Sequence, residues 1–105
     1  MTDTVLVLTT LGEQTDGPAF ARSLVDARLA ACVSLLPPMA SIYRWKEGVE
    51  QAQEQQVVIK TTRARLEALR AWMAVHHPYE VPEFLVLPVA AGGEAYLAWL
   101  TESVS

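Results

Sequence analysis

The chain has 105 residues, of which 51% are hydrophobic and 19% are charged. This length and composition predict a single folded domain, residues 1–105, with a core large enough to need no disulfide or structural metal. The formal net charge is −4, from 8 basic and 12 acidic side chains. Because the basic residues are few and dispersed, we expect neither duplex nucleic acid nor an anionic membrane as a partner.

The cysteine content and the N-terminal sequence indicate where the protein works. Cys32 is the only cysteine, which excludes an intrachain disulfide and favours a reducing compartment. The apolar run Val5–Leu8 follows no basic region and is too short for a signal peptide or a membrane span. We therefore predict a cytoplasmic protein.

The first elements are a strand and a helix. Residues 4–10 are apolar and β-branched, a pattern typical of a strand buried on both faces. Asp16 then provides a helix cap, and Pro18 lies near the first helical position. Apolar residues recur at helical spacing from Phe20, which predicts a helix ending near Leu29.

The next segment predicts one long hairpin. From Ala31 the hydrophobic period changes to two, and Pro37-Pro38 should make the strand bulge or break before it resumes at Ser41–Trp45. A turn at residues 46–48 leads into a return strand that ends near Ile59. Fourteen paired residues would reach about 45 Å, so the tip should extend beyond the core and favour self-association. The alternative is that the Gln-rich stretch is a loop and both strands are shorter.

The second half repeats the pattern of helix and strand. Thr61 or Thr62 can cap a helix in which Leu66, Leu69 and Met73 face inward, with His76 at the edge of that stripe. A short strand over residues 84–87 ends at Pro88, and an amphipathic helix with Tyr96, Leu97, Trp99 and Leu100 closes the chain. The order βαββαβ plus a terminal helix predicts the α+β class and a ferredoxin-like sandwich, an antiparallel sheet with both main helices on one face.

The loop His77–Glu83 is the candidate functional segment. Pro78 and Pro82 each fix φ and push the preceding residue toward extended backbone, so the loop should be rigid. It contains an imidazole, a phenol and two carboxylates, groups that can bind a metal, move protons or anchor a ligand. The alternative is structural, with the two prolines ending a helix and starting a strand.

His77 and Cys32 are the candidate metal ligands, because an imidazole with a thiolate favours copper or zinc. His77 opens the rigid loop, whereas we expect His76 to be a core-edge histidine. Cys32 could instead be a small core residue. A hydrolase that uses Cys32 as nucleophile lacks an orienting third group, and no nucleotide-binding glycine motif occurs. We therefore predict that the protein is not an enzyme.

Five ordered blocks resemble the CutA family, the divalent-cation tolerance proteins, over nearly the whole chain. They are Arg28–Val33, Ser41–Trp45, Ile59–Thr62, His77–Glu83 and Ala95–Trp99. The resemblance implies a ferredoxin-like protomer that forms a cytoplasmic homotrimer through its long hairpins, binds copper or another divalent ion, and has no established enzymatic activity. Within the matching blocks, the resemblance implies copper ligands only at His77 and Cys32.

Two features depart from the family pattern. Some relatives contain additional cysteines that this chain lacks, so one subunit cannot form a thiol-rich site. Pro37-Pro38 also stands where relatives often have Pro-Gly, which should stiffen the bend. The resemblance leaves open an alternative function, a PII-like signalling trimer whose clefts between subunits bind a small metabolite or a partner protein.

Overall fold

A four-stranded antiparallel sheet forms the centre of the structure, a computed structural model that describes residues 1–105. The strands are β1 (Thr4–Gly12), β2 (Cys32–Trp45), β3 (Gly48–Thr62) and β4 (Leu85–Pro88). They lie in the order β2-β3-β1-β4, and all three pairings are antiparallel. The helices are α1 (Gly17–Asp26), α2 (Leu66–His76) and α3 (Glu94–Ser103). This topology confirms the predicted ferredoxin-like sandwich.

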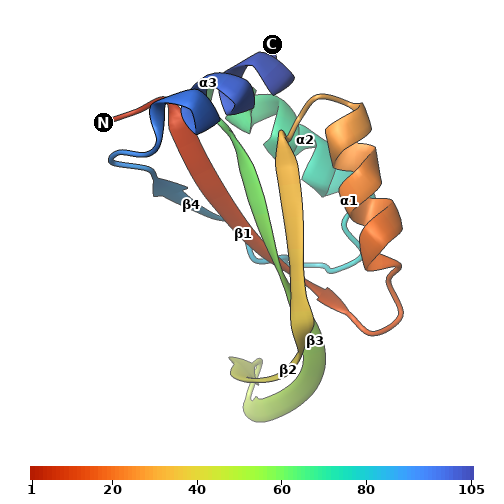
Figure 1. Cartoon of the computed structure of the whole chain (residues 1–105). Helices are drawn as coiled ribbons and strands as arrows, with labels where there is room; N and C mark the ends of the chain where they lie inside the picture. The colour runs from red at the N-terminus through yellow and green to blue at the C-terminus, as the bar shows by residue number, and fades with distance from the viewer.

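The core lies between the sheet and the first two helices. Figure 1 shows α1 and α2 on the same side of the sheet. Because side chains alternate across a strand, the odd-numbered residues of β1 and β3 point toward these helices. The buried cluster includes Val5, Val7, Leu11, Val57 and Ile59 from the sheet, with Phe20, Leu24, Leu69 and Met73 from the helices. On the opposite face, Leu6, Leu8 and Val58 remain half-buried.

Local sequence explains where α1 begins and ends. The Asp16 side chain accepts a hydrogen bond from the Ala19 backbone N–H at 3.0 Å, and Pro18 lies in the first turn, as predicted. The helix ends at Asp26, three residues earlier than expected. Arg28 has φ of 59°, a left-handed conformation that turns the chain toward β2.

The long hairpin is present, and pairing continues to Trp45 opposite Gly48. The alternative with shorter strands and a Gln-rich loop is therefore wrong. The register shifts between Leu35 and Pro38, which confirms the predicted bulge. The molecule measures 45 × 26 × 24 Å, and the hairpin extends beyond the rest of the domain (Figure 1).

The terminal helix α3 lies at the end of the sheet away from the hairpin tip (Figure 1). Its Leu100 and the following Val104 pack on Ala31, and Arg65 Nε donates a hydrogen bond to the Val104 carbonyl. Leu100 is buried, whereas Tyr96 and Trp99 of the same helix are exposed. No helix combines the length and the apolarity that crossing a membrane requires.

Candidate functional site

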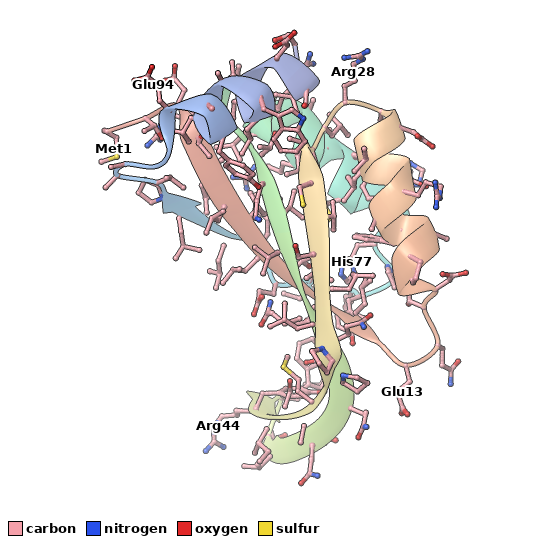
Figure 2. The ribbon with its side chains drawn as sticks, viewed as in Figure 1. Met1, Glu13, Arg28, Arg44, His77 and Glu94 are labelled. Carbon is pink, nitrogen blue, oxygen red and sulfur yellow. The ribbon has the colours of Figure 1, made fainter.

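His77 fixes the start of the 77–83 loop, and its side chain is buried. It follows the last residue of α2 and adopts extended backbone, with φ −77° and ψ 132°. Figure 2 shows it between the sheet and α1. The Tyr79 backbone N–H donates to Nδ1 at 3.1 Å, so Nε2 carries the proton and donates to the Thr10 carbonyl at 2.9 Å.

These contacts favour the neutral imidazole. Burial lowers the pKa of His77 below its ordinary value, and the Thr10 carbonyl and the Glu54 carboxylate oppose that shift only in part. Both ring nitrogens are already engaged. A metal at His77 must therefore displace the Tyr79 N–H from Nδ1 or the Thr10 carbonyl from Nε2.

Tyr79 connects the loop to the hairpin. Its hydroxyl donates to Glu54 Oε2 at 2.7 Å, and Glu54 lies opposite Gly12 in the sheet. A Cβ at Gly12 would lie 3.0 Å from the Tyr79 hydroxyl oxygen, so a larger residue here would force that hydroxyl to shift. Burial, with the hydrogen bond to Glu54, raises the pKa of Tyr79 above its usual range. The phenol therefore stays protonated at neutral pH and acts as a donor.

Glu83 fixes the far end of the loop. The Gln56 side-chain amide donates to Glu83 Oε2 and to the Thr9 carbonyl, both at 2.8 Å. With the contacts of His77 and Tyr79, the loop is held at three points along β1 and β3. These hydrogen bonds are what a rigid loop would require, and in them the imidazole, the phenol and one carboxylate each have a structural role.

The loop forms one wall of a groove of about 770 Å³. The other wall belongs to β2 and β3, and its position depends on the bulge. Before the bulge Leu35 lies opposite Val57, and after it Met39 lies opposite Glu54. The shift moves the odd-numbered side chains of β2 to the face away from α1 and α2, where Tyr43 and Trp45 line the groove.

Cys32 lies far from the loop. Its register partner is Lys60, whereas Thr10, the partner of His77, lies opposite Gln56. Four residues along the sheet correspond to about 13 Å, and β2 is about 10 Å from β1 across the intervening strand. Cys32 also neighbours Val33, which packs on the helix side, so Cys32 itself faces the opposite side. One chain does not bring Cys32 and His77 to the same ion.

A complete metal site does not occur within the single chain. No group of three or more His, Cys, Asp or Glu side chains converges at a distance suited to one ion. Cys32 is half-buried with a free thiol, and its sulfur lies 3.9 Å from the Ser34 hydroxyl oxygen. Ligation by Cys32 or His77 stays a prediction, and either would need groups from outside this chain.

The burial of the two adjacent histidines differs from the prediction. His76 is exposed and stacks on Trp72, with ring centroids 4.4 Å apart, so its prediction as a core-edge residue is wrong. The buried histidine is His77. The helical stripe does not continue into His77, because the backbone leaves the helix there.

Sequence reasoning missed the β3 side of the site. Glu54 and Gln56 lie in a polar run that carries no motif, and only the hairpin register places them beside the loop. Counting residues from the turn at Lys46 would have paired Glu54 with Met39 and shown that both belong to one face.

Comparisons with known proteins match the whole chain. The model of the family described as "CutA1 divalent ion tolerance protein" matches residues 5–103. The "Divalent-cation tolerance protein CutA" of Pectobacterium atrosepticum is 42% identical over 102 residues, 97% of this chain and 93% of the relative.

Solved structures agree with the sequence comparisons. CutA from Synechococcus elongatus is 42% identical with a TM-score of 0.93, covering 100% of this chain and 93% of that one. The "Periplasmic divalent cation tolerance protein CutA" from Archaeoglobus fulgidus is 25% identical with a TM-score of 0.91, covering 97% of this chain and 99% of that one.

Proposed function

Because the chain belongs to the CutA1 divalent ion tolerance family, we propose that it acts in tolerance to divalent cations by binding the ion, with copper preferred. The full-length family match is the observation that carries this proposal. The relatives are named for cation tolerance and not for a reaction, which supports a binding role without catalysis. The alternative of a PII-like regulator gains no support from these names.

The binding unit in this proposal is a homotrimer. The hairpin carries Ile42 and Val49 outside the domain, 69% and 66% exposed. The edge strand β4 is exposed along its length, including Leu85 and Leu87. Exposed apolar strand edges favour pairing with another chain. Light scattering on the purified protein should give three times the 11.5 kDa of one chain, and the mass of a single chain would contradict the trimer.

The ion in this proposal is bound between copies of the chain. Cys32 supplies the thiolate that a soft ion such as copper prefers, and His77 supplies an imidazole when the loop releases its Nδ1. Cys32 and His77 lie on opposite faces of one subunit. Groups from neighbouring subunits would therefore complete the coordination of an ion at Cys32 and of an ion at His77. This explains why a single chain contains no converging ligand set.

Calorimetric titration with copper tests the ligands. Cys32→Ser should weaken copper binding at least tenfold, and His77→Gln should weaken it while preserving side-chain volume. His76→Gln is the matched control, because His76 is an exposed imidazole next to the candidate. Wild-type affinity in both the Cys32 and His77 variants would exclude these ligands.

We place the protein in the cytoplasm, because its thiol is unpaired and a reducing compartment keeps it so. The Archaeoglobus fulgidus relative is described as periplasmic, so cell fractionation decides the location. Recovery of the protein in the periplasmic fraction would contradict the proposal.

A further inference from the structure

The long hairpin leaves the rest of the domain at one point on β3. Strand β1 pairs with β3 only as far as Glu54, which lies opposite Gly12. Residues 48–53 of β3 therefore pair with β2 alone, and Figure 1 shows this part of the hairpin curling away from the sheet. Because a ribbon of two strands has little stability of its own, the contacts at its base determine its direction.

The 77–83 loop holds the base of the hairpin from the face away from α1 and α2. The Tyr79 hydroxyl donates to Glu54 Oε2 at 2.7 Å, and it reaches this carboxylate past Gly12, where a Cβ would lie 3.0 Å from the hydroxyl oxygen. Two residues further along β3, the Gln56 amide donates to Glu83 Oε2 at 2.8 Å. Since alternate residues of a strand share a face, both bonds hold β3 from the same side.

The start of α1 holds β3 from the opposite face. Gln55 lies between Glu54 and Gln56, so its side chain points toward α1 and α2. Its Oε1 atom lies so close to Gly17, the first residue of α1, that a Cβ on Gly17 would be 2.6 Å away. Gln55 also lies opposite Pro38, where pairing resumes after the bulge. Both faces of β3 are thus in contact with the domain at the last point where β1 supports it.

We propose that these two contacts form a clamp that fixes the angle at which the hairpin leaves the domain, and that this fixed angle enables neighbouring copies to pair with the hairpin. Residues 48–53 span about 20 Å, so a rotation of about 10° at their base would move the tip by about 3.5 Å. That movement is as large as the whole donor–acceptor distance of a hydrogen bond, about 3 Å. An angle that is fixed before association lowers its entropic cost. The inference rests on the homotrimer proposed above and not on copper binding.

Subunit exchange tests the clamp on the full-length protein. Unlabelled and isotopically labelled assemblies are mixed, and native mass spectrometry follows the appearance of mixed trimers. Tyr79→Phe removes the hydroxyl on one side of the clamp and should speed exchange about tenfold, the lower limit for loss of one hydrogen bond to a charged group. Gln55→Ala removes the contact on the other side and should speed exchange by a similar factor. Because both contacts restrain one angle, the double variant should remain well below the roughly hundredfold acceleration of two independent effects.

Two matched controls separate the clamp from other effects of substitution. Val104→Ala shortens a side chain that is 3% exposed beside α3, so it lowers the free energy of unfolding without touching the hairpin. Gln53→Ala repeats the change made at Gln55 on the same face of β3, but beyond the end of β1. Neither control should change the exchange rate.

The outcomes distinguish the clamp from the homotrimer. A wild-type exchange rate in Tyr79→Phe or Gln55→Ala, an equal acceleration in either control, or a double variant with the full product of the single effects would each overturn the clamp and leave the homotrimer standing. A wild-type protein with the mass of a single chain would overturn the homotrimer and the clamp together.

Discussion

Removing one hydroxyl group should measure how firmly the 77–83 loop is attached to the hairpin. Tyr79→Phe keeps the ring beside Gly12 and His77 but removes the donor that lies 2.7 Å from Glu54 Oε2. A hydrogen bond to a charged group contributes about 1.5–3 kcal/mol. Because water can replace part of it at the half-buried Glu54, we expect the free energy of unfolding to fall by about 1–2 kcal/mol.

A double-mutant cycle isolates that contact from other effects of the substitution. Urea unfolding of Tyr79→Phe, Glu54→Ala and the double variant, all at one protein concentration, should give a coupling energy of about 1–2 kcal/mol. Tyr96→Phe is the control, because its hydroxyl accepts only a 3.3 Å bond from Lys60 at the surface, and its effect should stay within about 0.5 kcal/mol. A coupling energy below about 0.3 kcal/mol would refute the idea that this bond anchors the loop.

Three other substitutions test the remaining contacts and the assembly. Ile42→Glu should lower the mass measured by light scattering, because it places a charge on the exposed apolar hairpin. Gly12→Ala should lower the unfolding free energy by about 1–3 kcal/mol, since its Cβ would lie 3.0 Å from the Tyr79 hydroxyl oxygen. The pKa of His77 is lower in the folded protein than in the unfolded chain, so the unfolded chain binds a proton more readily than the folded protein does. Stability should therefore fall as pH drops below about 6.5. His77→Gln should reduce that pH dependence.

Each of these has a matched control. Val75→Glu changes an exposed valine on α2, and loss of the oligomer there would show that any added charge disrupts assembly. Gly48→Ala introduces a Cβ with its nearest neighbour at 3.9 Å, so a cost equal to that of Gly12→Ala would contradict the steric argument. His76→Gln should retain the wild-type pH dependence of stability. If stability no longer changed with pH in that variant, the attribution of the effect to His77 would be wrong.

Local signals were sufficient to predict most of the fold. Asp16 and Pro18 defined the start of α1 because capping depends on adjacent residues. Pro37-Pro38 predicted the bulge because proline cannot donate to a strand ladder. The exposed aromatic face of α3 was not predicted, since periodicity shows that a stripe exists and not how much of it the rest of the chain covers.

The site was less accessible to sequence reasoning, because its contacts join distant segments. His77 bonds to a residue 67 positions away, and Tyr79 bonds to one 25 positions away. The sequence identified residues 77–83 as a non-helical loop between α2 and β4, yet the partners of this loop on β1 and β3 depend on register. Cys32 is likewise separated from His77 by the strand order and by the side of the sheet on which its side chain lies. Neither the strand order nor the side can be read from one segment alone.

The most direct test of the proposed function is X-ray absorption at the copper edge on the copper-loaded assembly. Our account predicts stoichiometric copper with a sulfur ligand in the first coordination shell, and Cys32→Ser should remove that sulfur signal. Because Cys32 is the only cysteine in the chain, a thiolate ligand can come from no other position. A spectrum with only nitrogen and oxygen ligands, or one unchanged by Cys32→Ser, would contradict the proposed copper site.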